Sequence, residues 1–171
     1  MSGSHRSPFV VNLSNHDCRA LSSFDKLRTN GRGGIAPERK GGSVRFAGYA
    51  ALFGVADGVG DTIRPGAFAK ALSDGTTYPL YWQHNPAQPI GRVEAIAEDE
   101  RGLRVIARLD SHDSRAADLL LRGQVSGLSF GYRARGFERV PDGRVLRDIE
   151  LLEVSLVTHP LQPGARVHLV E

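Results

Sequence analysis

Ser129 is the leading candidate nucleophile because small residues flank it. It lies in the run Gly127-Leu128-Ser129-Phe130-Gly131, which fits the G-x-S-x-G pattern of the nucleophile elbow in α/β-hydrolases. That elbow must lead into a helix, whereas here a period-two alternation of residue types continues to Arg135. We therefore interpret Ser129 as a serine on a strand, with Leu128, Phe130 and Tyr132 on the opposite face. The flanking glycines leave space for a substrate backbone to approach.

A serine hydroxyl is a weak nucleophile until a base takes its proton, so the site needs a histidine partner. Of the six histidines, His84 is the best placed, because the run Trp82-Gln83-His84-Asn85-Pro86 puts it where an aromatic strand meets a loop. Taken alone, a histidine in a turn more often makes a structural hydrogen bond. His112 lies in a polar helix entry, where a solvated or capping role is expected.

A third residue must orient the imidazole and stabilise its charged form. Glu153 is a carboxylate inside the hydrophobic run 151–157, and two interpretations of it stay open. It is either the orienting acid or an outward-facing residue on a strand that buries its apolar neighbours. Arg133, four residues beyond Ser129 and on the same predicted strand face, is a candidate for binding an oxyanion or an acidic substrate group, and equally an ordinary surface arginine.

The composition excludes several other kinds of site. The single cysteine, Cys18, rules out an intramolecular disulfide and a cysteine-based zinc site. No His, Asp and Glu cluster has metal-ligand spacing, and there is no phosphate loop or dinucleotide fingerprint. We therefore expect no metal and no cofactor. No apolar run reaches the roughly 18 residues of a membrane span, and the N-terminus has no signal-peptide core, so a cytoplasmic protein is expected.

The basic character of the chain is concentrated at its start. Residues 1–45 hold eight of the 22 Lys and Arg residues but only three of the 19 Asp and Glu residues, which leaves the remainder at a net charge of −2. Nucleic-acid binding by the remainder therefore lacks electrostatic support. Residues 1–43 are rich in Ser, Asn, Gly and Arg, and we expect them to form a disordered basic tail or propeptide.

Residues 44–171 are expected to form one α+β domain, mostly antiparallel and built on a β-barrel or closed sheet. Short β-branched and aromatic runs predict most of its strands. Ser111 or Asp113 is expected to cap the second of two helices. The predicted strands are 44–53, 78–82, 90–97, 103–109, 126–135, 145–149 and 151–157, and the predicted helices are 65–72 and 113–122.

Five short runs, in order, resemble the tailed-phage prohead maturation proteases, and together they cover about residues 44–168. No single run would be specific, whereas five in this order and spacing are. They are FAGYAALF at 46–53 with GDTIRPGAF at 60–68, QHN at 83–85, PIG at 89–91, GLSFGY at 127–132, and LEVSLV at 152–157 followed by Pro160.

The resemblance implies a fold similar to the herpesvirus assemblins, a β-barrel surrounded by helices. It implies a serine endopeptidase that acts inside the immature capsid in the host cytoplasm, with His84 and Ser129 in the catalytic positions. Herpesvirus enzymes use a second histidine as the third member, where this chain offers Glu153. His159 stands where an apolar residue is expected in relatives, so it is given no catalytic role. Backbone amides near Gly131, helped by Arg133, would hold the oxyanion.

The partners that the resemblance implies are the major capsid protein and a scaffold protein, together with self-cleavage and self-association. No specific nucleic acid and no membrane are implied. A prophage or a gene transfer agent would be as consistent a source as a phage. Two other functions stay open: a non-catalytic capsid assembly module of the same fold, and nucleic-acid binding through the basic tail, which the family pattern does not contain.

Overall fold

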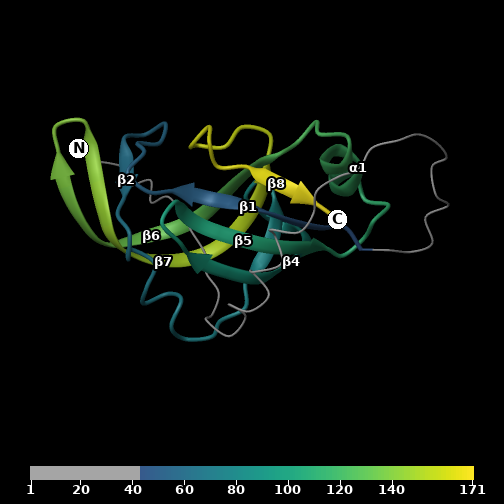
Figure 1. The fold of residues 1–171 in the computed structure, drawn as a ribbon, viewed down its shortest axis with the longest axis horizontal. Coiled ribbons are helices and arrows are strands. Elements are labelled where there is room, and N and C mark those ends of the chain that lie inside the picture. Colours follow the sequence, from purple (N-terminus) through teal and green to yellow (C-terminus); the bar gives the residue numbers. More distant parts are fainter. Residues whose placement is uncertain (1–42) are drawn as a thin grey trace.

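The computed structural model describes residues 43–171 (Figure 1). The predicted tail, apart from Ser43, lies outside the described residues. The elements in this part are β1 (Arg45–Leu52), β2 (Asp61–Ile63), β3 (Pro79–Trp82), β4 (Asn85–Glu98), β5 (Gly102–Leu109), α1 (Arg115–Leu121), β6 (Gly127–Val140), β7 (Gly143–Val157) and β8 (Val167–Val170).

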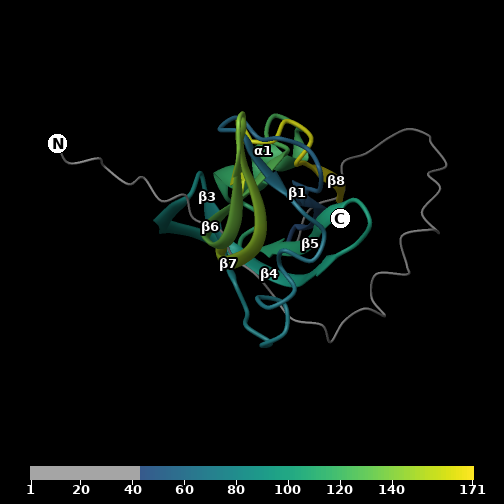
Figure 2. The ribbon, with the colours of Figure 1, turned by 90° about the vertical axis from the view of Figure 1, so that its left-hand side faces the viewer.

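The strands form one sheet in the order β2-β7-β3-β4-β5-β1-β8, and β6 pairs with β7 off this path. The pairs are antiparallel except that β2 and β3 run parallel to β7. Figure 2 shows β3, β6 and β7 side by side. The predicted, mostly antiparallel β domain with few helices is therefore confirmed. Its closure into a barrel is not confirmed, because the path is open and only an isolated bridge, Gly127 to Arg166, links β6 to the segment before β8 in the described residues.

One hydrophobic core anchors the strands that matter for the site. Leu128 on β6 and Val154 and Leu156 on β7 are fully buried, as is Leu80 on β3. Each such leucine contributes about 1.5–3 kcal/mol of transfer free energy on burial. Phe68 reaches the same core from the segment after β2. These side chains fix β3, β6 and β7 relative to one another.

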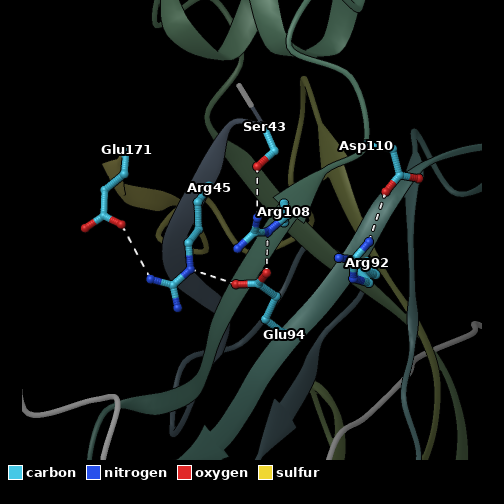
Figure 3. Close-up of polar contacts among 7 residues, drawn as sticks. All are labelled: Ser43, Arg45, Arg92, Glu94, Arg108, Asp110 and Glu171. Carbon is cyan, nitrogen blue, oxygen red and sulfur yellow. Dashed lines mark hydrogen bonds and ion pairs between the residues drawn. The ribbon is translucent and has the colours of Figure 1, made fainter. Parts of the chain in front are cut away.

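A polar network ties together the adjacent strands β4, β5 and β1 (Figure 3). The Glu94 carboxylate on β4 accepts hydrogen bonds from Arg45 Nε of β1, at 2.7 Å, and from Arg108 Nε of β5. Arg108 Nη1 also donates to Ser43 Oγ, at 3.0 Å. Burial alone would raise the pKa of Glu94, but the hydrogen bonds and charges of the two arginines outweigh it and hold the pKa below its usual value.

The helix predicted at 65–72 is wrong, because this segment is a series of turns. Gly66 has a φ of 85°, in the left-handed region that no α-helix enters. The Ala67 and Ala69 amides donate to carbonyls three residues back rather than four. The Glu98 carboxylate accepts hydrogen bonds from the amides of Gly66 and Phe68, at 3.0 and 2.9 Å. These bonds hold the turn against β4.

Two short strands, β2 and β8, were not predicted, and the other corrections concern where elements begin and end. α1 begins at Arg115, and its N-cap is Ser114 rather than Ser111 or Asp113, because the Ser114 side chain accepts the Ala117 amide. The strands predicted at 145–149 and 151–157 are one continuous strand, β7. α1 has seven residues, and no helix in residues 43–171 is long and apolar enough to cross a membrane.

Candidate active site

Strand β7 lies between β6 and β3 and therefore gathers residues from three parts of the sequence. On one side, Ser129 of β6 pairs with Ser155, and Gly131 pairs with Glu153. On the other side, Trp82 at the end of β3 pairs with Leu156. Because His84 follows Trp82 by two residues, it arrives beside the same stretch of β7.

The three predicted catalytic residues form a hydrogen-bonded series. His84 Nε2 lies 3.0 Å from Ser129 Oγ, and His84 Nδ1 lies 2.6 Å from Glu153 Oε1. An ionised carboxylate can only accept, so Nδ1 carries the proton and Nε2 is left to accept from the serine hydroxyl. Ser129 and Glu153 are buried, at 7% and 6% exposure, whereas the His84 side chain is 45% exposed.

Glu153 does not face outward, which was the alternative that the sequence left open. Val154, Ser155 and Leu156 are fully buried on both faces of the strand, and Glu153 is buried with them. A buried carboxylate requires partners. Glu153 has two, because its second oxygen, Oε2, accepts the hydroxyl of Ser155 at 2.5 Å.

The turn after β3 holds His84 in place by an unusual backbone conformation. Gln83 and His84 have φ angles of 53° and 59°, which are uncommon for residues other than glycine and cost of order 1–3 kcal/mol each. The Gln83 amide donates to the Leu156 carbonyl at 3.1 Å, and its side chain donates to Thr158 Oγ1 at 3.2 Å. The His84 amide donates to Ser155 Oγ at 3.1 Å. These contacts turn the imidazole back over β7.

Ser129 and His84 line a cavity of about 750 Å³ whose walls are mostly apolar. Phe130 and Tyr132 stack with their ring centroids 5.7 Å apart and form part of one wall. An extended peptide with apolar side chains has room to bind beside the serine. The lining residues are Asp57, Tyr81, His84, Pro86, Ser129, Phe130, Tyr132, Leu152, Glu153, His159 and Leu161.

The alternation predicted that Phe130 and Tyr132 lie on the face opposite Ser129. In the structure both side chains line the same cavity as Ser129. The pairing register between β6 and β7 shifts after Gly131, because Gly131 pairs with Glu153 and Tyr132 pairs with Leu151. The extra residue, Leu152, is therefore on β7, and a bulge of this kind bends the strand and increases its twist. The shift lies two residues from Ser129.

A buried ion pair holds Tyr132, one of the residues that line the cavity. Arg144 Nε donates to Asp61 Oδ1 at 2.7 Å, and its Nη2 donates to Oδ2. Tyr132 Oη donates to the same carboxylate. Burial, and then the bond to Asp61, raise the pKa of the Tyr132 phenol, which therefore stays neutral. No local motif in the sequence marks these three residues as a group.

Arg133 does not join the three residues. Its Nη1 donates to Glu150 Oε1 at 3.2 Å, its side chain is half exposed, and it does not line the cavity. His159 does line the cavity, with Nδ1 at 3.0 Å from Thr158 Oγ1. His112 contacts Asp113 at 3.2 Å, next to α1. Within residues 43–171, no group of three or more His, Cys, Asp or Glu side chains is arranged to hold a metal ion.

Comparison with protein families gives one match over most of the chain. The family model described as caudovirus prohead serine protease matches residues 35–171. The chain is 36% identical over 130 residues to the prohead protease of Enterobacteria phage HK97, covering 71% of this chain and 58% of that protein. It is 28% identical over 143 residues to the prohead protease of Escherichia phage T5, covering 80% of this chain and 68% of that protein.

Among solved structures, the fold is similar to that of varicella-zoster virus protease. The TM-score is 0.53 at 19% identity, over 76% of this chain and 64% of the viral chain. At this identity the likeness concerns the fold alone. It agrees with the likeness to herpesvirus proteases that the family resemblance implies, apart from the closed barrel.

Proposed function

The chain belongs to the caudovirus prohead serine protease family, and on this premise we propose that it is a serine endopeptidase of phage-like head maturation. Ser129 is the nucleophile, His84 the general base and acid, and Glu153 the orienting carboxylate. The observation that carries the proposal is the hydrogen-bonded series from Ser129 Oγ through the imidazole to Glu153, at the wall of a cavity large enough for a peptide.

Acylation begins when Ser129 Oγ attacks the scissile carbonyl carbon while His84 Nε2 takes the hydroxyl proton. The imidazolium that results is stabilised by Glu153, whose carboxylate lies 2.6 Å from Nδ1. As the tetrahedral intermediate collapses, the C–N bond breaks and His84 passes its proton to the leaving amine. Ser129 is left as an acyl ester.

Deacylation uses the same groups in reverse. A water molecule gives a proton to His84 Nε2 and attacks the ester carbonyl. Ser129 Oγ then leaves and regains its proton from the imidazolium, and the second product departs as a carboxylic acid. The His84 side chain is 45% exposed, so water can reach the imidazole once the amine product has left.

The oxyanion needs hydrogen-bond donors close to Ser129. Backbone amides near Gly131 are our candidates, because Gly131 lies two residues after Ser129 on β6 and has no side chain to keep a substrate away. Arg133 is the second candidate from the sequence. Its pairing with Glu150 means that it would have to exchange that partner for the substrate.

We infer that the substrates are a scaffold protein, the N-terminal region of the major capsid protein, or both, and that the enzyme also cleaves itself. The site of action is the interior of an immature capsid in the bacterial cytoplasm, where the chain self-associates and meets its partners. Confinement in one shell raises the effective concentration of enzyme and substrate, so weak activity of the free enzyme is consistent with this role.

The test is co-expression of the chain with its cognate major capsid protein, followed by intact mass measurement of both. We expect discrete truncations with the wild type and none with Ser129→Ala. Intact proteins in both cases, with capsid assembly still dependent on the chain, would overturn the proposal in favour of a non-catalytic assembly module.

A further inference from the structure

Ser155 makes two hydrogen bonds that close a ring around His84. Its hydroxyl oxygen accepts the His84 backbone amide at 3.1 Å, and the hydroxyl donates to Glu153 Oε2 at 2.5 Å. The other carboxylate oxygen of Glu153 accepts His84 Nδ1. The ring therefore runs from the His84 backbone, through Ser155 and Glu153, to the His84 imidazole.

Within residues 43–171, Ser155 supplies the hydrogen-bond partner of both the His84 amide and Glu153 Oε2. Glu153 is buried, so an oxygen without a hydrogen bond would keep its full desolvation penalty. His84 has a φ of 59°, a conformation that persists only where its surroundings hold it. Ser155 is fully buried and contacts both groups through one hydroxyl.

We propose that Ser155 is a positioning residue of this site. It fixes the His84 backbone and the Glu153 carboxylate together, so that Nε2 stays within reach of Ser129. This inference rests on the proposed protease function. Ser155 does not line the cavity, so it acts through His84 and Glu153 and not on the substrate.

Ser155→Ala removes the hydroxyl and leaves the backbone pairing of β7 with β3 and β6 in place. A misplacement of about 1 Å in an active site can cost about 10²-fold in rate, so we expect kcat to fall about 10- to 10²-fold. We expect KM to change less than about twofold, because the walls of the cavity are unchanged.

Val154→Ala is the matched control for loss of stability. Val154 immediately precedes Ser155 on β7 and is fully buried in the core. Truncating it costs stability through a cavity and touches none of the hydrogen bonds of the ring. Assayed well below the melting temperatures of both variants, Val154→Ala is expected to keep kcat within about twofold of the wild type. An equal loss of kcat in both variants would mean that Ser155→Ala acts only by lowering stability, which would overturn the inference.

A second readout needs no substrate. The proton shared by His84 Nδ1 and Glu153 in a 2.6 Å hydrogen bond is expected to give a far-downfield proton resonance, assigned by its loss in His84→Ala. We expect the resonance to persist in Val154→Ala and to move upfield or vanish in Ser155→Ala. An unchanged resonance and unchanged kcat in Ser155→Ala would refute the role of Ser155. If no variant cleaves any substrate, the protease proposal fails, while the resonance still reports on Ser155.

Discussion

Ser129 and Ser155 lie directly opposite each other in the ladder between β6 and β7. Residues opposite each other in an antiparallel pair point to the same face, so this register determines which side chains of β7 lie beside Ser129. It places Glu153 opposite Gly131, close to the serine. The parallel pairing of β3 with β7 then brings in His84 from 45 residues before Ser129.

Glu153→Gln is expected to lower kcat about 10²- to 10⁴-fold with little change in KM. The amide would present a donor where the carboxylate now accepts from His84 Nδ1, which favours the wrong imidazole tautomer. Steady-state kinetics on a peptide that spans the cleavage site measure the change. A fully active Glu153→Gln would remove this residue from the mechanism.

Asp61→Ala is expected to destabilise the fold by about 3 kcal/mol, because breaking a buried ion pair leaves its partners without their counter-charge. The value is at the lower end of the usual range because Arg144 is 27% exposed and can be hydrated. Urea denaturation measures the change in the free energy of unfolding. The control is Asp118→Ala, which removes the exposed pair of Asp118 with Arg122 on α1 and should cost no more than about 0.5 kcal/mol. Equal effects of the two changes would contradict the importance of the buried group.

Glu94→Gln is expected to lower stability in a pH-dependent way. Because its folded-state pKa is depressed, Glu94 contributes stability that is present above the unfolded pKa, about 4.3. That contribution is lost as the pH falls through the folded pKa. The difference in unfolding free energy between the wild type and Glu94→Gln should therefore be constant near pH 7 and shrink below about pH 4. A difference that grows on acidification would contradict the ion pairs of Figure 3.

Gly127→Ala is expected to destabilise the fold by about 1–3 kcal/mol, the usual cost of overpacking, and to lower activity. A Cβ at this position would lie 2.6 Å from the Val157 carbonyl oxygen and 2.7 Å from Pro160 Cδ, which would displace the start of β6 two residues before Ser129. Gly58→Ala is the control, because its Cβ would make an ordinary 3.4 Å contact with Leu161. Thermal melts compare the two, and equal melting temperatures would show that β6 tolerates the shift.

The sequence identified the candidate nucleophile and base from residue types and their short flanking runs. It left Glu153 ambiguous, because alternation predicts which residues share a face but not whether both faces are covered. Residues 153–157 of β7 are buried on both faces, so facing away from the apolar neighbours does not expose Glu153 to solvent.

Ser155 and Asp61 were missed for a different reason. Their roles depend on the pairing of distant strands, Ser155 with His84 across 71 residues and Asp61 with Arg144 across 83. A local pattern carries no information about such pairings. The helix at 65–72 was predicted from a run that begins with Pro and is rich in alanine. In the structure Gly66 is left-handed and its amide donates to Glu98, so a tertiary contact determines the conformation.

Labelling with a fluorophosphonate reports whether His84 activates Ser129. The reagent phosphonylates an activated serine with loss of fluoride, and peptide mapping by mass spectrometry locates the adduct. We expect one adduct, on Ser129, in the wild type, no adduct in Ser129→Ala, and labelling at least 10²-fold slower in His84→Ala. An adduct on another serine, or equal labelling rates in the wild type and His84→Ala, would contradict the activation of Ser129 by His84.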